Sequence, residues 1–466
     1  MKQFRLTISA FASLLLPAVL LAQATPDFRA ARDEAVQNLQ AMIRIDTSNP
    51  PGNESKLAEY LKGILDKEGI ASEIIAAEPG RGNLIARIKG NGRKQPLLLM
   101  GHSDTVGVEK AKWTVDAFAG LIQDGFVYGR GALDDKSGVA GMLQAFLMIH
   151  RRRLPLDRDI IFLAEAGEEA GGGVGIEFLV EKHWPRIECE FALNEGAEIY
   201  ARDGKVQYVG VATTEKLVRT MRLVARGTSG HGSMPRVDNP IVHLAAAVAK
   251  LGNYQPRLRL NETTRTFFER LATISPPAEA FLYTHLEDPA VGKMVEETIR
   301  RTNVYYNSML RTSISPNIIK GGFRFNVIPA EAEATLDIRA LPDENVEAFL
   351  AELRRVIDDP AVELSPLQSL WPATPPSSIN SEMFRALEKA QAQVFAGAVT
   401  LPVMLTGATD SASLRAKGVS AYGIGPIVTD DDVARMHGND ERLSVEGLGG
   451  FVEFLYRAVV EVSAAR

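Results

Sequence analysis

Five short polar clusters along the chain carry residue types that bind metal ions or transfer protons. Four of them follow apolar segments typical of buried strands, and the fifth opens a helical segment. Binding sites in open α/β sheets form beyond the carboxyl ends of the strands, so we expect the clusters to converge in space. The clusters are Gly101-His102-Ser103-Asp104, Asp134-Asp135-Lys136, Glu168-Glu169, Asn194-Glu195-Gly196 and Met436-His437-Gly438.

His102 and Asp104 stand two residues apart, which places them on the same side of an extended chain. At a turn, the carboxylate can accept a hydrogen bond from the second nitrogen of the imidazole ring. This contact fixes the tautomer and makes the ring a better metal ligand. An ordinary hydrogen-bonded turn is the alternative interpretation, and the pair by itself leaves both open.

Adjacent carboxylates occur at Glu168-Glu169 and at Asp134-Asp135. Two carboxylates near a buried strand end repel each other, and a bound cation makes the arrangement tolerable. One of the two glutamates could then bind a metal while the other, with a raised pKa, takes a proton from water. The alternatives are a solvated acidic loop for the glutamates and helix capping for the aspartates. Glu195, which follows another apolar strand, is a weaker candidate in isolation.

The composition limits what such a site can be made of. The chain has 466 residues, with 52 Lys and Arg against 58 Asp and Glu, which gives a net charge of −6. This slight acidity provides no basic surface, so we expect no nucleic-acid partner. The single cysteine, Cys189, excludes an intramolecular disulfide and a thiolate-rich metal site. Any metal must therefore be held by histidines and carboxylates.

The stretch 25–213 is expected to position most of the clusters. It alternates helical segments with short, continuously apolar strands such as Pro96–Met100 and Asp159–Ala164. Strands that are apolar on both sides are buried on both faces, which is typical of parallel sheets between two layers of helices. We therefore predict an α/β fold with a mainly parallel catalytic sheet.

The stretch 214–368 has a different pattern. Val218–Arg226 and Glu333–Ala340 alternate apolar and polar residues, and each is followed by a helical segment. This predicts an inserted α+β lid domain with one open sheet face, which carries a charged, helical insertion at about 255–314. Short strands and helices return in 369–466, so the catalytic domain is expected to consist of two segments.

Residues 1–24 have the pattern of a secretory signal peptide. Lys2 and Arg5 precede the apolar run Leu6–Leu21, and Ala22-Gln23-Ala24 provides a small-x-small cleavage site. We expect cleavage after Ala24 and a secreted or periplasmic protein without a stable membrane anchor. A single membrane anchor is the alternative, although the run is short for a span and contains Pro17.

Taken together, the clusters resemble the M20 metallopeptidase family, which includes aminoacylase-1, acetylornithine and succinyl-diaminopimelate deacylases, glutamate carboxypeptidase and carboxypeptidase S. The resemblance covers essentially all of the chain after the signal peptide. The motifs occur in the family's order, and the ordered set is far more specific than any one of them. The matching stretches are Gly101–Val106, Gly129–Gly138, Glu165–Glu169, Asn194–Gly196 and Met436–Gly438.

The resemblance implies a site for two Zn²⁺ ions, with Co²⁺ or Mn²⁺ possible in their place. His102 and Glu195 would hold one metal, Glu169 and His437 would hold the other, and Asp134 would bridge them. The family often has a cis peptide bond after the bridging aspartate. Two further residues would take part in catalysis: Asp104 would orient His102, and Glu168 would be the general base.

The resemblance extends to residues that contact the substrate. His231 matches a histidine that donates to the oxyanion, in dimeric members from the partner subunit. Asn326, Arg339 and Thr409 match substrate-binding positions, and the arginine suits capture of a carboxylate. A strand-face ion pair is the alternative for Arg339. The implied partner is a second copy through the lid domain, and the long insertion could replace or block that contact.

These observations predict a dizinc hydrolase that cleaves an amide bond next to a free carboxylate. The first expectation is a carboxypeptidase or dipeptidase acting on short peptides. The alternative is an N-acyl-amino-acid amidohydrolase. A non-catalytic binding protein on the same fold is a remote alternative, since no ligand or base is missing. A phosphoesterase is disfavoured by the acidic character of the site and the absence of a phosphate-binding lysine cluster.

Overall fold

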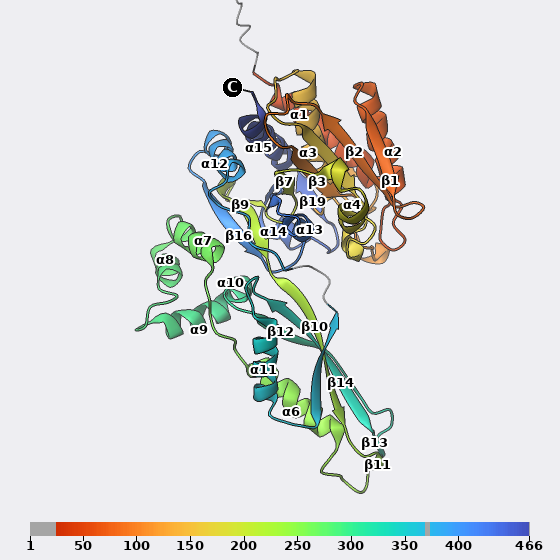
Figure 1. The fold of residues 1–466 in the computed structure, drawn as a ribbon, viewed down its shortest axis with the longest axis vertical. Helices are drawn as coiled ribbons and strands as arrows, with labels where there is room; N and C mark the ends of the chain where they lie inside the picture. Colours follow the sequence, from red (N-terminus) through yellow and green to blue (C-terminus); the bar gives the residue numbers. More distant parts are fainter. Residues whose placement is uncertain (1–24, 369–372, 466) are drawn as a thin grey trace, which may run out of the picture.

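A computed structural model describes residues 25–368 and 373–465 of the protein. Two bodies are joined end to end, with the catalytic domain above and the lid domain below (Figure 1). The strand β9, Lys205–Glu215, belongs to the sheet of the catalytic domain, and the next strand, β10, Leu217–Arg226, belongs to the sheet of the lid domain. None of the described helices is long and apolar enough to cross a membrane. The predicted signal peptide, 1–24, lies outside the described residues.

The catalytic domain is built on a ten-stranded sheet in the order β1-β2-β6-β3-β7-β17-β9-β8-β18, with β16 paired to β9. The central strands β6, β3, β7 and β17 are parallel, as is the β16–β9 pair, while β1, β2 and the β9–β8 pair are antiparallel. The strands are β1 Ser72–Ala76, β2 Gly82–Ile88, β3 Leu97–His102, β6 Ile160–Glu165, β7 Phe191–Asn194, β8 Ile199–Arg202, β9 Lys205–Glu215, β16 Val399–Leu405, β17 Ser420–Gly423 and β18 Ile427–Val428.

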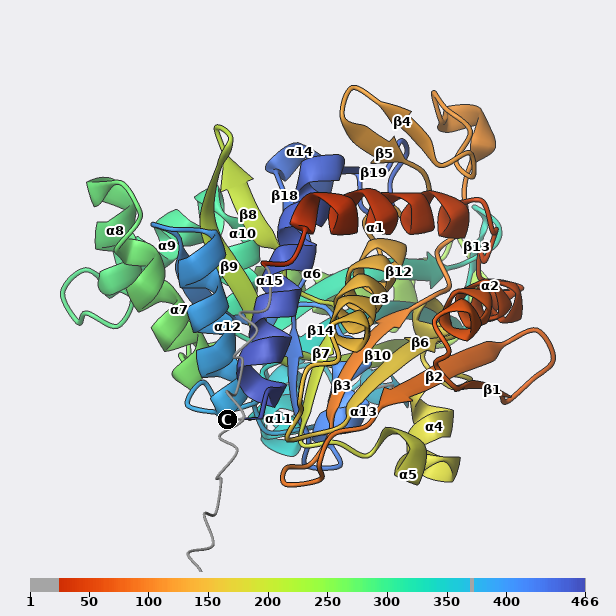
Figure 2. The same cartoon turned by 90° about the horizontal axis from the view of Figure 1, so that it is seen from above.

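Helices cover both faces of this sheet (Figure 2). In β3, Leu97 and Leu99 face one apolar cluster, whereas Leu98 and Met100 face another. Burial on both sides explains why the central strands are continuously apolar. One face carries α1 Phe28–Ile43, α3 Lys136–Arg151, α12 Glu382–Val394 and α15 Val445–Ser463, with α2 Glu54–Lys67 beside β1 and β2; the other carries α4 Ile176–Lys182, α5 Trp184–Ile187 and α13 Ser411–Arg415.

The lid domain has a four-stranded antiparallel sheet in the order β12-β14-β10-β15. Alternate residues of β14 are buried, and they pack under the two helices α6 and α11. A short ribbon, β11 with β13, lies at the end of the lid farthest from the catalytic domain (Figure 1). The elements are β10 Leu217–Arg226, β11 Gly230–His231, α6 Pro240–Asn253, β12 Ser313–Gly321, β13 Val327–Ile328, β14 Glu331–Ala340, α11 Val346–Ile357 and β15 Val362–Gln368.

The insertion forms four helices, α7 Glu262–Ala272, α8 Pro277–Thr284, α9 Gly292–Thr302 and α10 Val304–Met309. Although it lies within the lid segment of the sequence, its apolar side packs on the catalytic sheet. Phe267, Phe268 and Leu271 of α7 share an apolar cluster with Leu401 and Val403 of β16. The insertion therefore stands beside the catalytic domain, away from the β11–β13 ribbon (Figure 1).

The remaining short elements belong to loops of the catalytic domain. A three-stranded sheet in the order β19-β5-β4 places the segment after His437 against the segment before Asp134. The strands of this sheet are β4 Leu121–Gln123, β5 Phe126–Tyr128 and β19 Arg442–Ser444. The other short elements of the loops are the 3-10 turns η1 Lys110–Lys112 and η2 Glu168–Ala170 and the helix α14 Asp430–Val433.

Candidate metal centre

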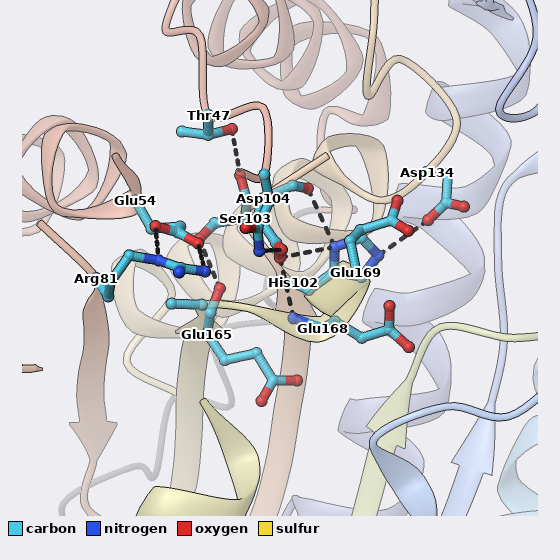
Figure 3. A network of polar contacts seen from close by, with 12 residues as sticks. Thr47, Glu54, Arg81, His102, Ser103, Asp104, Asp134, Glu165, Glu168 and Glu169 are labelled. Atoms are coloured by element: carbon cyan, nitrogen blue, oxygen red, sulfur yellow. Dashed lines mark hydrogen bonds and ion pairs between the residues drawn. The ribbon is translucent and has the colours of Figure 1, made fainter. Parts of the chain in front are cut away.

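The predicted clusters converge at the carboxyl ends of β6, β3 and β7 (Figure 3). His102 is the last residue of β3, Glu168 and Glu169 form the turn η2 after β6, and Glu195 directly follows β7. Because these strands are adjacent and parallel, their ends share one edge of the sheet. The start of α3 and the loop before β19 bring Asp134 and His437 to the same edge.

Asp134 lies between two histidines. Its Oδ1 is 2.9 Å from Nε2 of His102, and its Oδ2 is 2.9 Å from Nε2 of His437. Each carboxylate oxygen thus faces a different imidazole, which is the arrangement that a carboxylate bridging two metal ions requires. The peptide bond between Asp134 and Asp135 is cis, as the resemblance implies.

Glu169 completes a set of three oxygen and nitrogen donors. One ligand atom each from His102, Asp134 and Glu169 lie within 4.8 Å of one another. Glu169 Oε1 is 3.2 Å from His437 Nε2 but lacks the alignment of a hydrogen bond, and it is buried without a hydrogen-bond partner. A buried, unpartnered carboxylate oxygen beside two imidazoles fits a divalent cation of the zinc type.

Glu195 borders the same space as Asp134. Burial raises its pKa well above the ordinary range, and the charges of Glu168 and Asp134 raise it further. At His437, the neighbouring carboxylates of Asp134 and Glu169 raise the pKa to about 10 in the metal-free protein. This concentration of negative charge is what bound cations would neutralise.

Asp104 is fully buried behind His102 (Figure 3). Its Oδ1 is 3.5 Å from His102 Nδ1, which also lies 3.2 Å from the Asp104 carbonyl oxygen. The same carboxylate accepts hydrogen bonds from the backbone N–H of Glu168 at 3.1 Å and from Asn49 Nδ2 at 2.8 Å. Burial opposes ionisation of Asp104, but the contact with His102 outweighs it and lowers the pKa. Asp104 therefore couples the orientation of His102 to the position of the Glu168 turn.

Glu168 projects from the same turn, η2, as Glu169, beside His102 (Figure 3). Burial raises its pKa well above the usual range, and the nearby charges of Asp410, Glu169 and Asp134 add to this effect against the opposing influence of His102. A carboxylate with a raised pKa is matched to accepting a proton near neutral pH. The geometry therefore suits the general-base role that the resemblance implies.

Two residues to which the sequence analysis assigns no role hold this centre together. Glu441 Oε1 accepts hydrogen bonds from the backbone N–H groups of Leu133 and Asp134, at 2.8 and 3.0 Å, and Oε2 pairs with Arg130. Arg130 in turn donates to the carbonyl oxygens of His437 and Gly438 at 3.2 and 2.8 Å. This pair ties the Asp134 loop to the His437 loop. The contacts span more than 300 residues of sequence, so no local pattern signals them.

The predicted substrate-binding residues are not gathered in one place. Thr409 lines the cavity beside the metal centre, where its hydroxyl donates to Glu215 at 2.9 Å. Arg339 lies on β14 and forms an ion pair with Asp337 at 2.8 Å, which is the contact expected from the alternative interpretation. Both side chains are about one-third exposed, and a same-strand pair of this kind contributes little energy.

The ribbon of β11 and β13, which includes His231 and directly follows Asn326 at β13, lies at the far end of the lid (Figure 1). His231 belongs to β11, and the backbone N–H of Gly232 donates to the Asn326 carbonyl oxygen at 2.9 Å. Ser233 hydrogen-bonds the imidazole Nδ1 at 2.7 Å. Within a single chain, these two residues are therefore separated from the metal centre by the length of the lid.

A cavity of about 560 Å³ extends from Asp134 and Glu195 beneath the insertion. Its walls combine aromatic rings with small and branched apolar side chains. Among the lining residues are Tyr200, Tyr208, Phe267, Tyr305, Tyr306, Val403, Leu405 and Val428. Because Phe267 and the two tyrosines 305 and 306 come from α7 and α10, the insertion builds one wall of the space next to the reacting centre.

Glu198 lies in this wall among the tyrosines and has no role in the sequence analysis. Burial raises its pKa to about 7, with a further contribution from Asp134 and an opposing one from its own backbone amide. Tyr208 and Tyr305 line the same cavity, and both have raised pKa values, chiefly through burial and in part through the charge of Glu198.

The profile of peptidase family M20/M25/M40 matches residues 98–461. Among characterised sequences, the chain is 31% identical to N-fatty-acyl-amino acid synthase/hydrolase PM20D1 of Xenopus tropicalis, across 92% of this chain and 86% of that protein. It is 30% identical to "Probable carboxypeptidase S-like 2" of Dictyostelium discoideum, across 78% of this chain and 71% of that protein.

A solved structure has the same fold. The M20 family metallo-carboxypeptidase Sso-CP2 from Sulfolobus solfataricus superimposes with a TM-score of 0.68 at 19% identity, covering 92% of this chain and 99% of that one. The sequence similarity, the family profile and the shared fold agree with the resemblance that the ordered motifs predict. The chain therefore belongs to peptidase family M20/M25/M40, a family of metallopeptidases and amidohydrolases.

Proposed function

We propose that the protein hydrolyses the amide bond between an acyl group and an amino acid with a free carboxylate, using two divalent metal ions, in the first place Zn²⁺. The observation that carries this proposal is the position of Asp134, with one carboxylate oxygen on each of two histidines. His102 and Glu195 are assigned to one ion, and Glu169 and His437 to the other. The nitrogen and oxygen donor set without thiolates suits zinc, with cobalt or manganese as replacements.

In the proposed reaction, the residues of the metal centre have distinct roles. When bound, the two metal ions would polarise the scissile carbonyl group and lower the pKa of the attacking water. Glu168 takes the proton of that water and delivers it to the leaving amine, because its burial and acidic surroundings raise its proton affinity. Asp104 keeps His102 oriented, and Glu441 and Arg130 hold the Asp134 and His437 loops in register.

Two kinds of substrate fit this reaction. Short peptides, cleaved at the carboxyl-terminal bond, are the first candidate, and the carboxypeptidase S-like relative supports it. N-acyl amino acids are the second, supported by the PM20D1 relatives and by the aromatic cavity next to Asp134. In both, Arg339 receives the free carboxylate and Thr409 contacts the bound substrate.

The lid domain supports a homodimer in which His231 serves the partner's active site. The histidine belongs to β11 and lies next to Asn326, at the end of the lid away from the catalytic domain of its own chain (Figure 1). Apolar side chains on the same domain are exposed, including Val242, Ile319 and the 98% exposed Phe325. The insertion packs on the catalytic domain, so it leaves this surface open.

The amino-terminal pattern supports export of the mature chain, with cleavage after Ala24. Mass determination of the protein purified from the producing cells tests this directly. A mature amino terminus at Thr25 in the secreted or periplasmic fraction is the expected result. A full-length chain that stays with the membrane would support the anchor instead.

The variant Glu168→Gln tests the reaction. The change keeps the shape of the side chain but removes its ability to accept a proton, so we expect turnover to fall by about 10³-fold or more. Metal content, measured by mass spectrometry of the purified protein, is expected to remain at the wild-type value. Unchanged turnover would remove Glu168 from the mechanism, and lost metal would make it a ligand instead.

A further inference from the structure

The cavity beside the metal centre contains polar groups that no neighbouring side chain satisfies. Among the described residues, the Glu198 carboxylate receives a hydrogen bond only from its own backbone amide, and the hydroxyl groups of Tyr208 and Tyr305 have no partner. Tyr200, in the same wall, is already used, because its hydroxyl donates to Asp430 at 2.9 Å. One carboxylate and two phenols are thus free to bind something that enters the cavity.

The charge and surroundings of these groups indicate which ligand they suit. A carboxylate among aromatic rings attracts a cation, since the ring faces and the carboxylate both carry negative electrostatic potential. An anionic group would be repelled by Glu198 and by Asp430, which lines the same cavity. A purely alkyl chain would pack on the rings but shield the half-buried Glu198 carboxylate from water without giving it a partner, which costs free energy.

We propose that Glu198, with Tyr208 and Tyr305, forms a subsite that binds a protonated primary amine on the acyl part of the substrate. This inference rests on the proposed function, because it places the acyl part in the cavity that starts at Asp134 and Glu195. The amine would donate hydrogen bonds to the carboxylate and to the phenol oxygens, while the methylene chain packs on Phe267 and Val403. Glu198 is then a specificity-determining residue that favours aminoacyl groups over alkyl groups of equal length.

Pairs of substrates that differ only in the terminal group test this subsite. 6-Aminohexanoyl-leucine and heptanoyl-leucine have equally long acyl chains, which end in an ammonium and a methyl group, and 4-aminobutanoyl-leucine and pentanoyl-leucine form a shorter pair. We expect the wild-type enzyme to have the higher kcat/KM for the amine in at least one pair. In Glu198→Gln, the amine-to-methyl ratio of kcat/KM is expected to fall by about 10- to 100-fold, since a charged hydrogen-bond partner is lost.

Glu181→Gln is the matched control, because it makes the same chemical change on the exposed surface of α4. The ratio in this control should equal that of the wild type. Hydrolysis of the alkyl substrates reports whether Glu198→Gln is folded and active. An amine-to-methyl ratio that is the same in Glu198→Gln and in the wild type, for both pairs, would overturn the proposal.

A binding measurement separates this proposal from the proposed function. Calorimetry with the metal-loaded protein compares 6-aminohexanoate with heptanoate, and tighter binding of the amine that disappears in Glu198→Gln supports the subsite without any turnover. If neither acyl-leucine pair is hydrolysed, the proposed function fails while the calorimetry still decides the subsite. If both alkyl substrates are hydrolysed and neither assay favours the amine, the subsite fails alone.

Discussion

The buried pair of Arg130 and Glu441 offers a test of how the metal centre is held together. Their exposed side-chain fractions are 3% and 0%, and the glutamate also accepts the backbone N–H groups of Leu133 and Asp134. In Glu441→Gln, the amide oxygen can still accept those two hydrogen bonds. The negative charge opposite Arg130 is lost, so the variant isolates the ion pair from the backbone contacts.

The size of the effect follows from the burial. Removing one partner of a buried ion pair leaves an uncompensated charge and costs about 3–5 kcal/mol. This cost is a large part of the total free energy of unfolding of a typical domain, which is ~5–15 kcal/mol. Glu441→Ala should cost more, because the two backbone donors then lose their acceptor, at about 1–3 kcal/mol each. The double variant Arg130→Met with Glu441→Gln removes both charges and should be less destabilised than the sum of the single changes.

Urea unfolding of the metal-free proteins measures these free energies, so that loss of metal does not contribute. Asp66→Asn is the control, since it breaks the exposed pair with Lys62 and should cost less than about 1 kcal/mol. Metal titration of the same variants should show an affinity for metal that is weaker by about 10- to 100-fold, because the ion pair that connects the Asp134 loop to the His437 loop is lost. A change in unfolding free energy below 1 kcal/mol for Glu441→Gln, or strict additivity in the double variant, would refute the reasoning.

Three further predictions concern the substrate, the metal and pH. Arg339→Ala should raise KM by about 10- to 100-fold for substrates with a free carboxylate; the same rise with carboxyl-amidated substrates would speak against its role. Removal of metal by EDTA should lower Tm by about 5 °C, since ligands that bind only the folded state stabilise it, and calorimetry showing an unchanged Tm would contradict a metal bound by Asp134. Hydrogen bonding to Asp359 at 2.6 Å raises the pKa of His243 above its ordinary 6.5, so the pair should stabilise the fold below pH 6.5 and cease to do so as the pH rises through the folded pKa. NMR titration of His243 should show this raised pKa and its return toward 6.5 in Asp359→Asn; equal values in both proteins would be the contrary result.

Most elements of the fold follow from local patterns in the sequence. In the stretch 369–466, where the sequence predicts short strands and helices, the segment Glu382–Val394 is a helix, and the side chain of Ser381 caps it by accepting from the Phe384 N–H. The apolar segment predicted at Pro96–Met100 is the buried strand β3, Leu97–His102. Such patterns are readable because burial on one face or two imposes its own period on the chain. β16, which pairs in parallel with β9, is not among the predicted strands.

Packing partners of the insertion could not be predicted in the same way. Its helices have apolar sides, but a sequence period shows only that a side is buried, not what covers it. In the structure that partner is β16 of the catalytic sheet rather than the lid sheet. This choice creates the aromatic cavity and places Glu198, Tyr208 and Tyr305 around one space.

The sequence by itself determined the types of chemical group in the candidate site and the family to which the chain belongs, because each motif is local and its order along the chain is specific. Only the tertiary structure decided which groups meet. Asp134 lies between His102 and His437, and His437 is 303 residues after Asp134 in the chain. Glu441 accepts a hydrogen bond from the Asp134 backbone N–H and forms an ion pair with Arg130. Contacts of this kind depend on how strands and helices are brought together, a three-dimensional arrangement that no periodicity of neighbouring residues records.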